Sequence, residues 1–244
     1  MNKILVSKEG ITGIKVLDNY IKLTDGEYLL EYMDDGDYEI NFIINGNVKL
    51  IECSFDREVN ITNTYDINKG SLNIVKFYNN LSVNEVDNIN LCKKSTIINY
   101  NFSNICRGVE KYVINVDHNF KDTSSNINNK SIALVNSDIN FVINSSVLKD
   151  CNNSILDQTT RIVTMGECNA SISPNMFIDL DDIEAKHGSI IGSFKEDEIF
   201  YLMSKGINYN DALKLLIKGY LLGNFLGDIE LRFRIMEIID EYWR

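Results

Sequence analysis

The sequence predicts a mainly β protein that ends in a small helical segment. From residue 1 to about residue 190, short apolar stretches alternate with polar residues at a period of two, which is typical of strands with one buried face. Corners rich in Asn and Ser separate these stretches. After Gly192 the apolar residues take helical spacing instead. We therefore expect a β core over residues 1–192 and a helical segment over residues 193–244.

The clearest expected strands are two alternating runs in "YEINFIINGNVKLIEC", residues 38–53. They flank Asn45-Gly46, and because Asn-Gly is the pair best suited to a type I′ turn, we expect a β-hairpin here. Similar alternation predicts further strands at residues 72–78, 95–102, 111–116, 131–136, 139–144 and 161–165. No apolar stripe at helical spacing persists within these stretches, so none of them is expected to be a helix.

The strand pattern leaves three all-β architectures open: a sandwich, a closed barrel and a solenoid of stacked coils. The short strand–corner rhythm favours the solenoid, although the sequence contains no strict internal repeat. Asn is abundant, whereas Pro174 is the only proline. Asn suits tight corners and stacked side-chain ladders, but a base-composition bias in the genome would give the same enrichment, and both interpretations stay open.

Three helices are expected after the β core. Ser193 with Glu196 resembles a capping box, so the first helix is expected to begin there and to end at Gly206. Asn208 is a good N-cap for the second helix, and the third follows Gly227. The expected buried faces are Ala212, Leu215, Leu216, Gly219 and Tyr220 in the second helix, and Ile229, Phe233, Met236 and Trp243 in the third.

Composition excludes several classes of function. The chain has 24 basic and 35 acidic residues, a net charge of −11, and no basic run, so nucleic acid and anionic membranes are not expected as partners. There is no apolar run that would span a bilayer and no signal peptide, so we expect a cytoplasmic location. The five cysteines are odd in number and scattered, which predicts free thiols rather than disulfides or a zinc finger. No known catalytic motif occurs, so an enzyme is not expected.

Residues 161–221 carry an ordered set of motifs. The set consists of Pro174, Asp181-Asp182-Ile183, His187-Gly188-Ser189-Ile190-Ile191-Gly192, Phe200-Tyr201-Leu202, Lys205-Gly206-Ile207, Ala212 and Gly219-Tyr220. In this order the motifs resemble the C-terminal core of the SufB/SufD family, the scaffold subunits of SUF iron–sulfur cluster assembly. The family more often has Ala-Thr at Ser189-Ile190 and Arg at Lys205, where Lys keeps the charge but loses bidentate geometry. Members usually carry an N-terminal helical region, so a short form is expected.

The resemblance implies a right-handed parallel β-helix followed by helices that dock SufC, an ABC-type ATPase. It also implies a non-catalytic scaffold that pairs as a homodimer, or as a heterodimer with a SufB- or SufD-like subunit, while an iron–sulfur cluster is transiently assembled. Cys168 and His187 fall on positions that the resemblance associates with cluster assembly, and iron accepts both thiolate and imidazole as ligands. The residues implied in partner binding are Tyr201, Leu202, Lys205, Gly206, Ala212 and Tyr220.

Each candidate residue also has a structural interpretation. A lone cysteine such as Cys168 is most often a small buried hydrophobe, and a His before Gly, such as His187, is more often a hydrogen-bonded turn residue than a ligand. We expect Phe200 in the core, Tyr201 nearer a partner surface and His118 in a surface turn. Two other functions therefore stay open. One is a degenerate family member with only a docking or dimerisation role, and the other is a β-helical enzyme acting on polysaccharide through clustered carboxylates.

Overall fold

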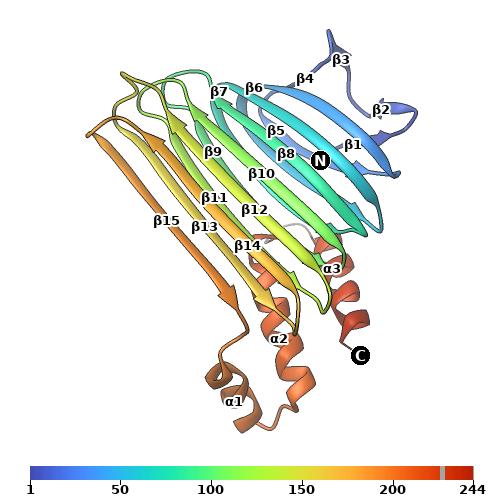
Figure 1. Ribbon diagram of the computed structural model, residues 1–244. Helices are drawn as coiled ribbons and strands as arrows, with labels where there is room; N and C mark the ends of the chain where they lie inside the picture. The colour runs from blue at the N-terminus through green and yellow to red at the C-terminus, as the bar shows by residue number, and fades with distance from the viewer. Residues whose placement is uncertain (226–228, 244) are drawn as a thin grey trace.

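Strands that lie far apart in the sequence run parallel and side by side, so the chain winds into a β-solenoid (Figure 1). The computed structural model describes residues 1–225 and 229–243. Strands make up 61% of the chain and form about 7 turns, and three short helices follow at the C-terminal end. The expected mainly β fold with C-terminal helices is confirmed, and of the three open architectures the solenoid is the one that forms.

The solenoid has two faces, each built from parallel strands. The first face contains β4 (Tyr20–Leu23), the first halves of β6 (Gly36–Phe55) and β7 (Glu58–Asn79), then β8 (Ser82–Leu91), β10 (Val109–His118), β12 (Asp138–Val147) and β14 (Asn169–Ile178). The second face contains β1 (Asn2–Ser7), β5 (Gly26–Tyr32), the second halves of β6 and β7, then β9 (Ile97–Cys106), β11 (Ser124–Ala133), β13 (Ser154–Thr164) and β15 (Ile183–Gly192). At the N-terminal end, β2 (Gly10–Thr12) pairs antiparallel with β1, and β3 (Val16–Leu17) with β4.

Successive coils become longer along the solenoid, which explains why the sequence shows no strict repeat. Asp66 and Asn90, which are hydrogen-bonded between neighbouring coils, are 24 residues apart. Further along the first face, steps of 27, 29 and 31 residues separate the members of a hydrogen-bonded ladder formed by Asn88, Asn115, Asn144 and Asn175. The expected Asn ladder is therefore present, although it lies within the strands rather than at the corners.

Asn45 and Gly46 do not form the expected hairpin. β6 continues through both residues with only a register shift after Ile44, and it pairs in parallel with β7 on both sides of the shift. Gly46 lies where the preceding coil passes closely, since a Cβ atom here would be 2.8 Å from the backbone nitrogen of Asp25. The Asn47 backbone N–H donates to the Asp25 carboxylate at 2.6 Å. The hairpin prediction was wrong because Asn-Gly also suits a corner where the chain turns from one face to the other.

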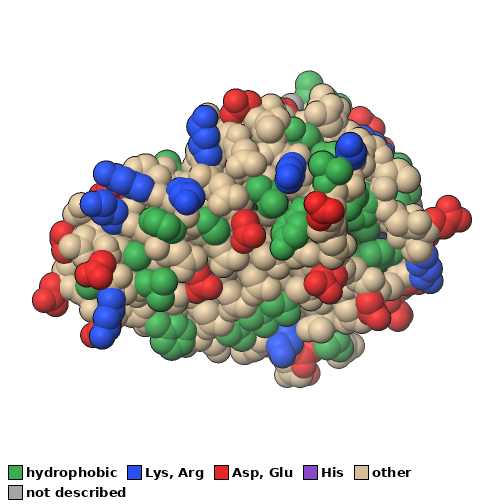
Figure 2. All heavy atoms as spheres, turned by 90° about the horizontal axis from the view of Figure 1, so that it is seen from above, with side chains coloured by type: hydrophobic (Ala, Val, Ile, Leu, Met, Phe, Trp, Pro, Cys, Tyr) green, Lys and Arg blue, Asp and Glu red, His purple; other side chains and the backbone are tan. Residues whose placement is uncertain are grey.

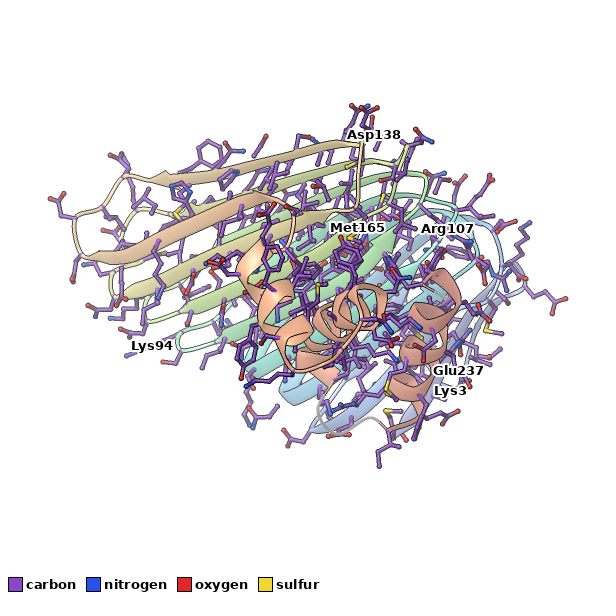
Figure 3. All side chains as sticks on the ribbon, turned by 90° about the horizontal axis from the view of Figure 1, so that it is seen from below. Lys3, Lys94, Arg107, Asp138, Met165 and Glu237 are labelled. Carbon is purple, nitrogen blue, oxygen red and sulfur yellow. The ribbon has the colours of Figure 1, made fainter. Side chains whose placement is uncertain are left out.

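A second apolar core lies between the outer side of the second face and helices α2 (Tyr209–Leu222) and α3 (Ile229–Tyr242). Its strand residues include Val75, Phe77, Ile105, Ile132 and Val163, and its helix residues include Ile217, Leu221, Ile235 and Ile239. Helix α1 (Glu196–Ser204) buries no residue and extends beyond this core (Figure 1). Seen from below, the helical segment lies across the strands (Figure 3). A short 3₁₀ helix, η1 (Gly223–Phe225), follows α2. The helical segment is thus attached mainly through α2 and α3.

The expected helix ends are confirmed at three of four places. Gly206, at φ +86°, follows α1, and Asn208 caps α2. However, α1 begins at Glu196 after Lys195, so a capping box at Ser193 was wrong by two residues. The start of α3 at Ile229 agrees with a helix after residue 227, which itself lies outside the described residues.

The buried sides of the helices agree with the expected ones only in part. As expected, Ala212 is buried, and Leu216, Tyr220, Met236 and Trp243 pack against the second core. The residues that α3 buries are Leu231, Ile235 and Ile239. By contrast, Ile229 and Phe233 are 69% and 58% exposed, Leu215 of α2 is exposed, and Phe200 of α1 is 61% exposed rather than in the core. Each helix carries apolar residues on more than one side, so spacing alone allowed two stripes. The position of the strands selects between them.

The surface carries charged side chains of both signs. On the face shown in Figure 2, Lys and Arg side chains lie scattered among Asp and Glu and form no continuous basic patch. In the part of the chain that the structure describes, no helix combines the length and apolar character needed to cross a membrane. All five cysteines are free thiols, as expected.

Candidate functional site

The last coil of the solenoid, formed by β14 and β15, is uncovered, and we call it the open end (Figure 1). Each of its strands pairs on one side only within the described residues, β14 with β12 and β15 with β13. Large apolar side chains are exposed here, with Phe177 and Ile190 each 60% accessible. Unpaired strand edges and exposed apolar side chains are what an interface with another protein would cover.

His187 lies in the middle of β15, at this open end. It is in register with Gln158 of β13, which is 2% exposed and points into the solenoid. Side chains in register on adjacent parallel strands point the same way, so His187 continues an inward column. It is exposed because, among the described residues, no further coil covers it. The imidazole is thus held on a rigid strand and is open to a partner.

Cys168 lies at the corner that leads into β14. It is half-buried and lines a shallow hollow together with Asn136, Ser137, Glu167 and Asn169. Burial raises the pKa of the Cys168 thiol. Since the thiolate is the form that binds metal or attacks sulfur, this thiol needs a bound cation or a partner to activate it.

Cys168 and His187 do not lie together within one chain. The corner at Cys168 follows the C-terminal end of β13, whereas His187 lies five residues before Gly192, the last residue of β15. Five strand residues span ~16 Å, which is too far for both side chains to bind one small cluster. Among the described residues, no three His, Cys, Asp or Glu side chains are grouped so that they could hold a metal ion. A cluster would therefore need ligands from elsewhere.

Helices α1 and α2 form the second candidate surface, a shallow groove between them. Tyr201 is 63% exposed and lines this groove with Leu202, Leu216, Asp197 and Glu198. The Nζ atom of Lys205 lies 5.3 Å from the centre of the Tyr201 ring, a cation–π contact. We call these five lining residues the α1–α2 groove.

The remaining residues implied in partner binding are placed differently. Gly206 follows Lys205 at the exposed end of α1. Ala212 is fully buried, and Tyr220 donates a hydrogen bond to the Arg161 carbonyl at 2.6 Å. These two residues therefore hold α2 against the solenoid.

A group of charged side chains lies inside the solenoid and was not expected from the sequence. We call it the interior charge cluster. The Nζ atom of Lys76 lies 3.2 Å from Glu52 Oε1, 2.7 Å from Glu85 Oε1 and 2.6 Å from Asp87 Oδ2. All four residues are at most 1% exposed. Burial by itself lowers the pKa of Lys76, but the three carboxyl groups outweigh it, and the net shift is upward. Three carboxyl groups within 3.2 Å thus favour the charged form of Lys76.

The sequence did contain a signal for this cluster. Glu85 and Asp87 are in phase with Val83 and Ile89, the buried residues of β8. A charged residue at the inward phase of a strand predicts a buried ion pair. The partner Lys76 could not be identified without the register between coils. Because these carboxyl groups are sealed from solvent, they cannot serve an enzyme that acts on polysaccharide.

His118 was also misplaced, since it is fully buried rather than in a surface turn. Its Nδ1 lies 2.7 Å from Thr123 Oγ1 and its Nε2 lies 2.9 Å from Ser125 Oγ. Burial lowers the pKa of His118 to about 4. His118 is in register with Leu91 and Val147 on the neighbouring strands, and both are buried. Its side chain points inward as theirs do, which explains its burial.

We expect His118→Leu to make stability less sensitive to acid. As the pH falls from about 6.5 to 4, His118 becomes protonated in the unfolded chain but stays neutral in the folded protein. The free energy of unfolding of the wild type therefore falls by up to about 3 kcal/mol. Urea unfolding at about pH 7.5 and pH 4.5 measures this loss. The variant should show a smaller loss between these pH values, and equal losses in both proteins would show that His118 is not held neutral.

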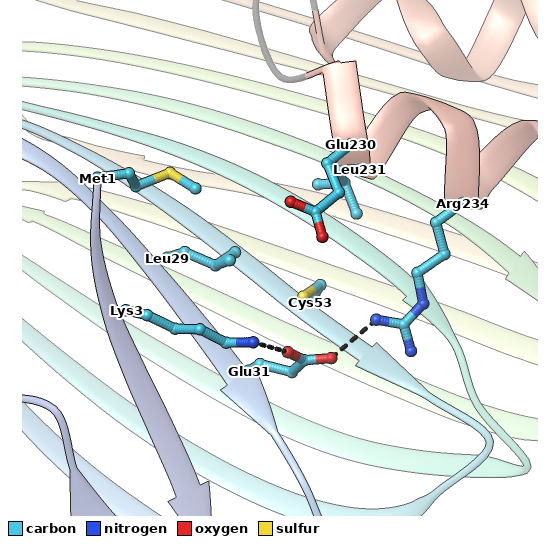
Figure 4. A pocket seen from close by; sticks show the side chains of 8 residues that line it. All are labelled: Met1, Lys3, Leu29, Glu31, Cys53, Glu230, Leu231 and Arg234. Carbon is cyan, nitrogen blue, oxygen red and sulfur yellow. Dashed lines mark hydrogen bonds and ion pairs between the residues drawn. The ribbon is translucent and has the colours of Figure 1, made fainter.

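A small cavity of about 100 Å³ lies between α3 and the strands β1, β5 and β6 (Figure 4). Glu31 bridges Lys3 at 3.1 Å and Arg234 at 2.8 Å across it. Burial by itself raises the pKa of Glu31, but Arg234 and Lys3 outweigh it, and the net shift is downward. Burial raises the pKa of the Cys53 thiol, which lines the cavity, so Cys53 is an inert core thiol. The cavity thus marks a structural contact between α3 and the first coils.

The fold and its open end define a class, namely a parallel β-solenoid scaffold with a C-terminal helical segment. Residues 72–220, more than half of the chain, match the family described as SUF system FeS cluster assembly, SufBD core domain. The chain belongs to this SufBD family.

Individual relatives support the same assignment. An iron–sulfur cluster assembly SufBD family protein of Pyrococcus horikoshii is 38% identical over 65 residues, which are 27% of this chain and 14% of the relative. The iron–sulfur cluster assembly protein SufD of Escherichia coli is 38% identical over 47 residues, or 19% of this chain and 11% of the relative. SufD of Bacillus subtilis is 28% identical over 97 residues, or 33% of this chain and 22% of the relative. The matched segments are thus a small part of each relative.

Proposed function

We propose that the protein is a non-catalytic scaffold of SUF-type iron–sulfur cluster assembly in the cytoplasm. The observation that carries the proposal is the open end, where His187 and exposed apolar side chains lie on strands that pair on one side only within the described residues. The family to which the chain belongs takes part in this assembly pathway. The five free cysteines suit a reducing compartment.

In this proposal two subunits meet at their open ends, either two copies of this chain or one copy and a SufB- or SufD-like subunit. The separation of Cys168 from His187 within a chain supports pairing, because a second subunit would bring further ligands to the same place. The iron–sulfur cluster is the cargo that is built at the interface and then passed on. Thiolate and imidazole ligands suit iron, and a partner would also provide the environment that deprotonates Cys168.

The α1–α2 groove is the proposed contact for the SufC-type ABC ATPase. Its centre is apolar, with Tyr201, Leu202 and Leu216, and its rim carries Asp197 and Glu198. An exposed tyrosine beside a polar rim is a composition typical of protein interfaces. Because α1 buries no residue of its own, it is free to be covered by a partner.

The test is anaerobic co-expression with the SufC-type ATPase of the same organism, with purification through a tag on the ATPase. Iron, sulfide and visible absorption are measured for the wild type, Cys168→Ser and Cys92→Ser. We expect the wild type to co-purify with a cluster and Cys168→Ser to lose most of it, because Ser offers no soft thiolate ligand. Cys92 is also a partly accessible free thiol and serves as the matched control, which should keep the cluster.

The outcomes separate the two candidate functions. If the complex forms without a cluster, the docking or dimerisation role alone is supported. The packing of Cys168 against the inner apolar core is the observation that favours this second candidate, because a thiol in that setting is most often structural. If Cys168→Ser keeps the cluster, the scaffold role stands and Cys168 is not one of the cluster ligands. If the ATPase does not co-purify under any nucleotide condition, the scaffold proposal fails.

A further inference from the structure

We propose that Glu85 carries a proton in the folded protein, so that the interior charge cluster holds one proton that the unfolded chain releases at neutral pH. The cluster combines one cation, Lys76, with three carboxyl groups in a space that is closed to solvent. If all three carboxyl groups were ionised, the core would hold two uncompensated negative charges, which is very costly. Hydrogen-bond geometry identifies which group is neutral.

Two of the three carboxyl groups are supplied with donors on both oxygens. Glu52 accepts from Tyr65 at 3.1 Å on Oε2, and from Lys76 and Tyr78 on Oε1. Asp87 accepts from Asn63 at 3.1 Å on Oδ1, and from Lys76 and Tyr100, each at 2.6 Å, on Oδ2. A carboxylate with donors on both oxygens is stabilised in its charged form. Glu52 and Asp87 are therefore the ionised members.

Glu85 lacks this support. Its Oε1 receives the third N–H of Lys76 at 2.7 Å, but its Oε2 is buried and has no hydrogen-bond partner among the described residues. An unpaired oxygen costs much less on a neutral acid than on a carboxylate, because the neutral form is less strongly hydrated in water.

The hydroxyl of Tyr78 decides where the proton lies. This oxygen contacts Glu52 Oε1 and also lies 3.0 Å from Glu85 Oε1, yet a phenol has only one proton to donate. Glu52 is the ionised one of these two groups, since Lys76 and Tyr65 already supply donors to its two oxygens, so Tyr78 donates to Glu52. Glu85 then donates its own proton to the Tyr78 oxygen, and every close contact in the chain joins a donor to an acceptor.

The other groups that face Glu85 agree with this assignment. They are Tyr32 of β5, Glu52 of β6, Tyr65, Lys76 and Tyr78 of β7, Asp87 of β8, Tyr100 of β9 and Tyr112 of β10. Burial raises the pKa of each of these tyrosines, so all of them stay protonated. Burial also raises the pKa of Glu85, the neighbouring Asp87 raises it further, and Lys76 offsets only part of the shift.

The test compares three isosteric variants: Glu85→Gln, Glu52→Gln and Asp87→Asn. Urea unfolding of each is measured between about pH 5 and pH 9. We expect the folding equilibrium constant of Glu85→Gln to stay within about threefold of the wild type at pH 5, because a neutral amide replaces a neutral acid. We expect each of the other two variants to lower it at least about tenfold, because each removes an ionised partner of Lys76.

The pH dependence provides an independent reading. If the pKa of a group is higher in the folded state than in the unfolded chain, the protein loses stability as the pH rises above the pKa of the unfolded chain. The folding equilibrium constant then falls by up to tenfold per pH unit. In Glu85→Gln, the folding equilibrium constant should therefore depend less steeply on pH than in the wild type. Glu110, whose pKa burial raises to about 7, contributes in the same direction and remains in all three variants.

The proposal is overturned if Glu85→Gln lowers the folding equilibrium constant as much as the other variants do, or if its stability depends on pH as steeply as that of the wild type. It is also overturned if Glu52→Gln or Asp87→Asn leaves the folding equilibrium constant unchanged. A second measurement does not depend on variant stability. The infrared spectrum of the wild type at about pH 8 should contain the carbonyl band of a protonated carboxyl group, and absence of this band would also overturn the proposal.

Discussion

Lys76→Met is expected to lower the free energy of unfolding by about 3–5 kcal/mol, because it leaves Glu52 and Asp87 as buried charges without their cation. Met matches the length of the lysine stem, so the loss arises from charge rather than from a cavity. The three carboxyl contacts of Lys76, between 2.6 and 3.2 Å, disappear together. Urea unfolding at neutral pH measures the effect.

The matched control is Lys149→Met. The Lys149 side chain is 82% exposed, and its nearest carboxylate, on Asp179, lies 4.0 Å away. Exposed ion pairs contribute little, so this variant should change stability by less than about 0.5 kcal/mol. If Lys76→Met lowered the free energy of unfolding no more than the control does, the side chains of the interior charge cluster would be uncharged. The assignment of a positive charge to Lys76 would then be wrong.

Much of the fold was predictable from local pattern. Alternation at a period of two depends only on which side of a strand is buried, so the strands around Tyr112 and Phe141 were found without knowledge of their neighbours. The corner at Gly46 was not, because its conformation depends on Asp25 in the preceding coil. The growing coil length also hid the repeat, since a period that changes from 24 to 31 residues leaves no fixed spacing to detect.

The candidate site was predictable only in part, and for a physical reason. His187 and Tyr201 lie in contiguous motifs, and both are exposed as a partner contact requires. Ala212 and Tyr220 belong to the same motifs, but the side of α2 that faces the solenoid is decided by tertiary packing. The interior charge cluster depends on the register of three strands, and the burial of His118 depends on the coils on either side of it. Such long-range properties are not contained in any short stretch of sequence.

Tyr201→Ala is expected to weaken binding of the SufC-type ATPase by about 30-fold, which corresponds to the ~2 kcal/mol of an aromatic hot spot. This prediction depends on the proposed docking role. Tyr201 is the largest side chain in the α1–α2 groove, and its ring also orders Lys205 through the cation–π contact at 5.3 Å. Isothermal titration calorimetry with the purified ATPase, with and without nucleotide, measures the affinity.

Phe200→Ala is the matched control, because Phe200 is the neighbouring aromatic residue of α1 and is exposed to nearly the same degree, 61% against 63%. It does not line the groove, so its removal should change the affinity less than about threefold. Neither side chain is buried, and both variants should therefore fold as the wild type does. Equal losses in the two variants would mean that the ATPase covers the whole exposed side of α1, whereas no loss in either would place the contact away from this helix.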